Sequence, residues 1–308
     1  MSDLEIRHLH REELDAEMWD RVVAASPAEH LYAWSWYLDE CAGNWSALVA
    51  DQYRYVMPLV WKRKLGIRYL YQPVFCQQLG ILGNEVADAE VVRIFVETTM
   101  KLFPAGFMQL NSLNRLPVDS RCKTTERENF TLRLDRDISE LRRGFSENTR
   151  RNLKKAMVRS GPVERVDNLG EYLDFKRECD KGSQPARSYE RMNRLFGALI
   201  SRERGSVYGI REGGELMAAA FMARSNTRLV YLQSVSSVKG KELRGMFRIV
   251  DEAIREHASS GLLLDFEGSV IPSVARFFAG FGAIPESYQR ISFNRLPLKV
   301  LSGRVYGS

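Results

Sequence analysis

Cysteine and histidine are scarce in this chain of 308 residues, which contains four of each. The cysteines stand singly and never approach a CxxC spacing, so the sequence predicts neither a zinc ribbon nor a disulfide framework. The histidines form no HExxH motif, and His8 and His10 lie near a terminus, where solvation is the more usual state. We therefore expect reduced thiols and no metal site.

Long apolar runs are also missing. The longest is the eight-residue run Leu216–Ala223, which is too short to cross a bilayer. The N-terminal segment MSDLEIRHLHREELD lacks the apolar region of a secretory signal. We therefore expect no membrane span and cytoplasmic residence.

The overall composition is that of a folded soluble protein, with 44% hydrophobic and 27% charged residues, and the length suits two domains. The net charge is +6. The short stretch 141–160 has seven basic residues and one acidic residue, so its excess of basic residues equals the net charge of the whole chain. Such a local field favours an anionic partner, namely phosphate, nucleic acid or an acidic membrane surface. A solvated helix face is the open alternative.

The clearest pattern in the second half is a strand, a loop, a helix and a second strand between Arg228 and Gly282. The segments RLVYLQSVSS and LLLDFEGS are β-prone, while apolar residues from Met246 onward recur at spacings of three and four. The basic loop VKGKELRG, which contains two glycines, precedes this helix. Backbone N–H groups at a helix start suit a phosphate or another oxyanion, although many α/β proteins contain this unit without a nucleotide site.

Other segments have regular patterns too. In the first half they predict helices at 15–25, 35–41 (with Ser35 as N-cap) and 85–103, a hairpin of 45–50 with 53–61, and strands at 68–71 and 107–110. The segment YQPVFCQQLGIL suits either a pocket-lining loop or an edge strand interrupted by Pro73. In the second half, Glu212-Gly213-Gly214 predicts a tight hairpin turn.

The order of elements repeats weakly, first across 13–112 and again across 188–267, as a duplicated α/β unit would leave it. The polar segment 111–129 shows no period, so we place a domain boundary near residue 125. We expect modules at 1–125 and 126–308, each with a mixed sheet crossed by a helix.

Several motifs of the second half form a recognisable set. They are FSENTRRNLKKA (145–156), the hairpin and strand of 205–234, the helix from Met246, and LDFEGS (264–269) followed by RFFAGFGA (276–283). On these motifs the chain resembles the tandem GNAT-like acyltransferases of the Fem type, and especially their BioF-like acetyltransferase relatives. The first half matches by element order and by its SWYL and YQPVF segments.

This resemblance implies an α/β fold of two tandem GNAT-like (acyl-CoA N-acyltransferase) modules with a cleft between them. It also implies an enzyme that moves an acyl group, with acetyl expected, from a carrier to an amine without a covalent intermediate. Acyl-CoA is the expected co-substrate. The alternative donor is an aminoacyl-tRNA, which relatives use to add amino acids to peptidoglycan precursors.

The donor loop departs from the simple GNAT pattern, in which Arg or Gln, two residues, Gly, one residue and then Gly or Ala precede the helix. No register of KGKELRGM fits that pattern. The candidates that remain for holding a diphosphate are Lys239, Gly240, Lys241, Arg244 and Gly245.

Acyl transfer to an amine needs an aimed neutral amine, a donor for the oxyanion and a proton source for the leaving group. Asp265 and Glu267 end a predicted buried strand, where alternation places both on one face, and Glu267 is the first candidate for the general base or amine-binding anion. Tyr231 and Gln233 alternate in the same way, and either one is a candidate to face the donor carbonyl. Helix capping, ion pairing with Arg276 and sheet packing are the structural alternatives.

Further residues are candidates for substrate binding. Arg150, Arg151 and Lys154 suit a phosphate-rich ligand, since arginine forms bidentate contacts with phosphate. Arg187 and Tyr189 follow a predicted flexible loop and suit an acidic substrate, with exposure to solvent as the alternative. Gln233 and Ser269 complete this set.

Two functions from other classes stay open. A transferase fold without activity would serve as a peptide- or polysaccharide-binding module. The basic helix would alternatively bind nucleic acid without chemistry, although no aromatic-interleaved basic motif of an RNA-binding module is visible. The sequence does not identify the acceptor or the oligomeric state.

Overall fold

The computed structural model describes residues 4–117, 121–268 and 271–296, and it divides them into two compact units. The first unit holds the described residues up to Arg127 and those from Ser287 onward, and the second unit is Glu128–Glu286. The first division lies two residues from the boundary that we predicted near 125. The return of the C-terminal strand to the first unit was not part of the prediction, and it follows from the pairing of that strand with β6.

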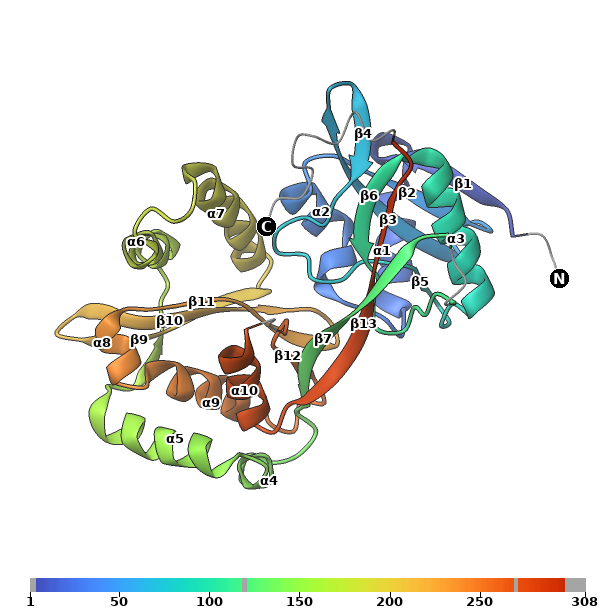
Figure 1. Cartoon of the computed structure of the whole chain (residues 1–308). Coiled ribbons are helices and arrows are strands. Elements are labelled where there is room, and N and C mark those ends of the chain that lie inside the picture. The colour runs from blue at the N-terminus through green and yellow to red at the C-terminus, as the bar shows by residue number, and fades with distance from the viewer. Residues whose placement is uncertain (1–3, 118–120, 269–270, 297–308) are drawn as a thin grey trace. The chain divides into compact units, whose positions relative to one another are not determined.

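The first unit is a mixed sheet with helices (Figure 1). Its elements in chain order are β1 (Ile6–His10), η1 (Arg11–Glu13), α1 (Ala16–Ala25), η2 (Leu31–Ala33), α2 (Ser35–Cys41), β2 (Trp45–Ala50), β3 (Tyr55–Lys64), β4 (Ile67–Leu70), β5 (Leu82–Gly83), α3 (Ala89–Leu102), β6 (Ala105–Gln109), the first part of β7 (Lys123–Arg133) and most of β13 (Ile284–Asn294). The strand order is β1-β2-β3-β4-β6-β13, and β5 pairs with β3. Only the β4–β6 pair is parallel among these strands.

The helices of this unit begin and end where local signals place them. Asp15 and Asp88 cap α1 and α3 by accepting hydrogen bonds from backbone N–H groups of the first turn, and α3 ends before Pro104. The predicted N-cap at Ser35 is wrong, because α2 begins at Ser35 with Trp34 as its cap. The Ser35 hydroxyl instead donates to Asp20 of α1.

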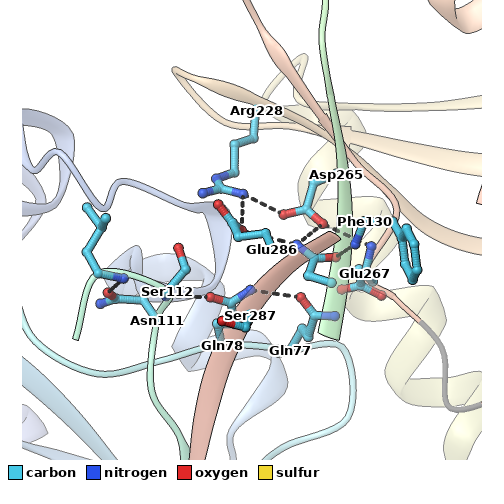
Figure 2. Close-up of polar contacts among 12 residues, drawn as sticks. Gln77, Gln78, Asn111, Ser112, Phe130, Arg228, Asp265, Glu267, Glu286 and Ser287 are labelled. Atoms are coloured by element: carbon cyan, nitrogen blue, oxygen red, sulfur yellow. Dashed lines mark hydrogen bonds and ion pairs between the residues drawn. The ribbon is translucent and has the colours of Figure 1, made fainter. Parts of the chain in front are cut away.

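The segment YQPVFCQQLGIL is largely irregular, and its glutamines hold it in place. The Gln72 side chain donates to the Cys76 carbonyl and accepts from the Gln109 backbone, while buried Gln78 accepts from the Ser112 N–H (Figure 2). These amides satisfy loop backbone groups that lack a ladder partner. Side-chain hydrogen bonds therefore hold the loop together with backbone bonds such as that from the Leu79 N–H to the Gln109 carbonyl at 2.8 Å.

The second unit is a six-stranded mixed sheet with helices on both faces (Figure 1). Its elements are β7 (Lys123–Arg133, from Glu128), α4 (Ile138–Arg143), α5 (Glu147–Arg159), β8 (Val163–Arg165), α6 (Leu169–Asp180), α7 (Ala186–Ser201), β9 (Gly205–Glu212), β10 (Glu215–Arg224), β11 (Arg228–Ser236), α8 (Val238–Glu242), α9 (Gly245–His257), β12 (Leu263–Asp265) and α10 (Pro272–Gly280). The order is β7-β12-β11-β10-β9-β8, and only β11 and β12 run parallel.

Aromatic residues build the core on each face of this sheet. Helices α6 and α7 cover one face, where Phe196 stacks on Phe221 with ring centroids 4.0 Å apart. Helices α9 and α10 cover the other face, where Phe266 stacks on Phe278 at 4.8 Å. The predicted hairpin turn is confirmed, since Gly213 and Gly214 both adopt positive φ between β9 and β10.

Two predictions for local structure are wrong. Residues 238–242, which we expected to be loop, form α8, and Ser237 caps it by accepting from the Gly240 N–H. Residues 123–129, which we expected to be aperiodic, form the first half of β7. Their side chains are mostly exposed, so they carry no apolar alternation that would mark a strand.

Within the described ranges, every helix is either too short or too polar to span a bilayer.

Candidate functional site

Strands β11 and β12 separate part-way along β11. They pair only where Arg228–Val230 lie beside Leu263–Asp265. Strand β12 then ends, whereas β11 continues to Ser236. Among the described strands none takes the place of β12 beyond Val230, so the second half of β11 has an open edge.

A β-bulge in β11 lies at the point of separation. Tyr231 pairs with Met222 and Gln233 with Phe221, which leaves Leu232 without an opposite residue. A bulge bends its strand and breaks the alternation of side chains. Tyr231 therefore faces α9 and α10, while Gln233 shares the opposite face with Phe221. The prediction that Tyr231 and Gln233 point the same way is wrong for this reason.

The open edge of β11 forms one wall of a cavity of about 360 Å³. Its apolar lining comes mainly from aromatic side chains of α9 and α10: Phe247, Val274, Phe277 and Phe278. Its polar lining comes from hydroxyl and cationic side chains: Tyr231, Ser234, Ser236, Lys241, Arg244 and Ser273. The cavity thus suits a ligand with an apolar arm and an anionic group.

The cationic part of the cavity lies where α8 meets α9. Lys241 and Arg244 are exposed there, and neither forms an ion pair with a described residue. Arg244 adopts a left-handed φ of 60° and directly precedes α9, whose first N–H groups have no acceptor within the helix. Two free positive charges beside a helix N-terminus favour an anion.

The two glycines of this connection allow α8 and α9 to lie close to β10. A Cβ atom on Gly240 would stand 1.9 Å from the Met217 carbonyl oxygen, and one on Gly245 would stand 2.9 Å from the Ala218 Cβ. The Gly240 N–H already donates to the Ser237 hydroxyl at 3.0 Å. These glycines therefore contribute close packing, and the Gly240 N–H is occupied.

Asp265, at the end of β12, is held on both carboxylate oxygens (Figure 2). One oxygen accepts from the Asn129 amide and from the Glu267 N–H, each at 2.9 Å, and the other accepts from Arg228 at 2.9 Å. Arg228 also lies 3.6 Å from Glu286. The Asp265 side chain is only 2% exposed, so this network compensates a buried charge.

Glu267 lies in an irregular segment after the strand. It adopts a left-handed φ of 58°, and Gly268 adopts 62°, where a Cβ would stand 2.2 Å from the Glu128 carbonyl oxygen. The predicted alternation of Asp265 with Glu267 fails because β12 ends at Asp265. A non-glycine residue in this backbone region costs about 1–3 kcal/mol, which the Glu267 N–H bond to Asp265 helps to offset.

Comparison with known families bears directly on this cavity. A model described as acetyltransferase (GNAT) domain matches residues 139–268, which include β11, α8, α9 and β12. The chain contains a GNAT-type acetyltransferase domain at residues 139–268. Its expected tandem GNAT-like, mixed α/β fold is confirmed, and an acyl donor and an amine acceptor follow from the domain type.

Solved structures resemble the whole chain at low sequence identity. FemX matches with a TM-score of 0.70 and 12% identity over 97% of this chain and 100% of its own. A tandem GNAT protein from the clavulanic acid biosynthesis pathway matches with 0.55 and 12% over 96% and 99%. L-PGS from Bacillus licheniformis matches with 0.50 and 10% over 86% and 92%. None of the curated protein sequences matches the chain.

Some predicted site residues of the GNAT domain lie at the cavity. Tyr231 lines it, is 7% exposed, and has a pKa that burial raises well above its usual range. Lys241, Arg244, Gly240 and Gly245 also line it, whereas Lys239 does not and lies 3.7 Å from Glu212.

Other predicted residues lie elsewhere in the domain. Arg150, Arg151 and Lys154 are exposed on α5 and line none of the described cavities. Arg187 is exposed in the first turn of α7, and Ser269 lies outside the described residues.

Tyr189 belongs to a packed network between α6 and α7. Its hydroxyl donates to Asp180 at 2.8 Å, and Asp180 also pairs with Lys176, which is 4% exposed. Burial and the bond to Asp180 raise the pKa of Tyr189 to about 12. The role of this tyrosine in the structure is thus to join α7 to α6.

The cavity also contains residues that sequence reasoning did not single out. Ser234, Ser236, Phe247, Phe277 and Phe278 line it. The spacing of these phenylalanines in the sequence is the same as that of ordinary core residues, because the same helix faces fill the core and line the cavity. The sequence therefore has no signal that distinguishes them.

Proposed function

We propose that the GNAT domain moves an acyl group, with acetyl as the first candidate, from a coenzyme A thioester to an amine. The cavity at the open edge of β11 is the proposed donor site. Its combination of an aromatic lining with Lys241 and Arg244 is the observation that carries the proposal. A pantetheine arm would lie along β11 and the phenylalanines, and the diphosphate would lie near the cations and the start of α9.

The exposed backbone of β11 supports this placement. An extended amide-containing arm can replace the missing strand by hydrogen bonding to N–H and C=O groups that have no ladder partner on that side. The cavity volume of about 360 Å³ is at the lower end of the range of about 300–1,000 Å³ for small-molecule pockets. Such a volume suits the arm, with the nucleotide portion outside.

The proposed reaction is a direct displacement at the thioester carbonyl. The amine nitrogen forms a bond to the carbonyl carbon, the bond from that carbon to sulfur breaks, and the amine loses a proton. Tyr231, kept protonated by burial, is the proposed hydrogen-bond donor to the carbonyl oxygen. Glu267, partly exposed after β12, is the proposed acceptor of the amine proton, and the thiolate takes a proton from solvent.

A second candidate donor is an aminoacyl-tRNA. The observation that favours it is the surface of α5, where Arg150, Arg151 and Lys154 are exposed and form no ion pair with a described residue. Unpaired cations along one helix suit a nucleic-acid backbone.

The donor is tested by thermal unfolding with acetyl-CoA, longer acyl-CoA thioesters, or aminoacyl-tRNA in excess. A ligand at 100 times its Kd stabilises the folded state by about 2.7 kcal/mol, which raises the Tm by roughly 4 °C for a chain of this size. A shift with a CoA thioester supports the proposal. A shift with aminoacyl-tRNA alone transfers support to the second candidate, and no shift with any of them overturns both.

Blocking the cavity provides a matched pair of variants. Ser273→Trp places an indole at the lining of the cavity on α10, whereas Ala279→Trp adds the same side chain at an exposed position of the same helix that does not line it. The first variant is expected to lose the shift caused by the CoA thioester, and the second to retain it. Equal shifts in both variants would place the donor elsewhere.

A further inference from the structure

The first unit contains a second cavity, of about 630 Å³, around the start of β2. It is lined by ends of strands and by the connection from α2: His10, Arg11, Glu12, Asp39, Gly43, Asn44, Trp45, Trp61, Arg63 and Arg68. All of these residues belong to the first unit, so the cavity is separate from the GNAT domain of 139–268.

The hairpin of β3 and β4 forms one wall. It extends beyond the start of β2, since Trp45 pairs with Val60 while β3 continues to Lys64. Arg63 and Arg68 are directly opposite each other across this hairpin, and Trp61 lies two residues before Arg63 on the same face. One face of the hairpin thus presents two guanidinium groups beside an indole.

Among the described residues, no carboxylate forms an ion pair with either arginine. Arg63 donates to the Gly66 carbonyl oxygen at 3.0 Å. Like charges directly opposite across a β-ladder are destabilising. An anion between the two guanidinium groups would remove that repulsion and accept hydrogen bonds from both.

The acidic residues at the cavity do not cancel this charge. Asp39 accepts two hydrogen bonds from Arg11, both at 2.8 Å, and one from the Trp45 indole at 2.8 Å. Asp39 and Arg11 therefore neutralise each other, which leaves Glu12 against Arg63 and Arg68. The pKa of His8, on the same sheet face, is lowered by burial and further by the positive charges of His10 and Arg68.

The indoles add a second recognition element. Trp61 is partly exposed, with the Arg68 guanidinium 5.7 Å from its ring centroid. An indole face beside guanidinium groups stacks flat rings, as aromatic platforms do for the bases of nucleic acids. The volume falls in the range of about 300–1,000 Å³ that holds small ligands.

We infer that this cavity binds a phosphorylated ligand that has a flat ring, of the size of a nucleoside monophosphate. The phosphate lies between Arg63 and Arg68, and the ring stacks on Trp61. This inference is independent of the donor proposed for the GNAT domain.

The test is titration calorimetry of the full chain with adenosine and uridine 5′-monophosphates, ribose 5-phosphate and inorganic phosphate. Tryptophan fluorescence gives a second readout, because all five tryptophans of the sequence precede residue 62 and belong to the first unit. The variant Arg63→Gln/Arg68→Gln is expected to weaken nucleotide binding by at least about tenfold, since each lost contact is a charged hydrogen bond. Trp61→Leu is expected to weaken the nucleotides by about tenfold and to leave ribose 5-phosphate unchanged.

The matched control is Arg133→Gln/Arg136→Gln, which removes the same charge from exposed arginines of the second unit that line none of the described cavities. This variant is expected to bind nucleotides as the parent chain does. Equal weakening in both double variants would refute the inference, because it would show a response to net charge. It would equally be refuted by no nucleotide binding at millimolar concentration, or by ribose 5-phosphate binding as tightly as the nucleotides.

Discussion

Replacement of Arg228 by methionine is expected to destabilise the second unit strongly. Arg228 and Asp265 are 12% and 2% exposed, and their closest atoms lie 2.9 Å apart. Breaking a buried pair by removing one partner costs about 3–5 kcal/mol, because the remaining charge is left uncompensated. Asp265 would keep its bonds from Asn129 and the Glu267 N–H, so we expect a loss of about 3 kcal/mol, the lower end of that range.

Urea unfolding followed by circular dichroism measures this loss. The double variant Arg228→Met/Asp265→Asn also removes the uncompensated charge of Asp265, and it is expected to recover at least about 1 kcal/mol of the loss. Arg255→Met is the control, since Arg255 pairs with Glu252 on the surface and should cost less than about 1 kcal/mol. A loss below about 1 kcal/mol for Arg228→Met would refute the assignment of Asp265 to a structural ion pair.

Three further perturbations test other parts of the structure. Gly240→Ala is expected to lower the free energy of unfolding in urea by about 1–3 kcal/mol, because the added Cβ would collide with the Met217 carbonyl oxygen. Unchanged stability would contradict the close packing of Gly240 against β10. Burial lowers the pKa of His257, so the stability that this group contributes is complete above its unfolded pKa of about 6.5 and is lost as the pH falls through the lower folded value. His257→Gln should therefore flatten the decline of the Tm at acidic pH. A Tm profile identical to that of the parent chain would contradict this reasoning. The Sγ atoms of the buried residues Cys41 and Cys76 lie 3.2 Å apart, so oxidation by diamide should join them in a disulfide. Alkylation of the unfolded chain should then detect two fewer thiols, whereas Cys41→Ser should show no such loss.

The fold was predictable where a segment has either apolar periodicity or the residues that a tight turn requires. The helix α9 and the Gly213-Gly214 hairpin were predicted because each has a local signal: a stripe with period 3.6, or glycines that supply positive φ. The first half of β7 was missed because its side chains are polar on both faces, so that its strand conformation depends on pairing partners far away in the sequence.

The candidate site was predictable only in part, for a related reason. The resemblance identified the acyltransferase class, and the α8–α9 connection with Lys241 and Arg244 does line the cavity. The orientation of Gln233 could not be predicted, because a bulge at Leu232 reverses the alternation and leaves no mark in the sequence. The end of β12 at Asp265 likewise depends on its pairing with β11 and β7, which no local pattern encodes.

The pairing of β13 with β6 also has a consequence for synthesis of the protein. Residues 290–294 of β13 form the ladder with β6, whereas β6 and the strands that precede it in the sequence are complete by residue 109. While the ribosome is still translating the second unit, the edge of β6 that later pairs with β13 is unpaired. Such edges favour pairing with other chains. A fragment that stops after Arg127 would keep that edge permanently, so expression of the first unit alone calls for a circularly permuted gene that supplies β13 beside β6.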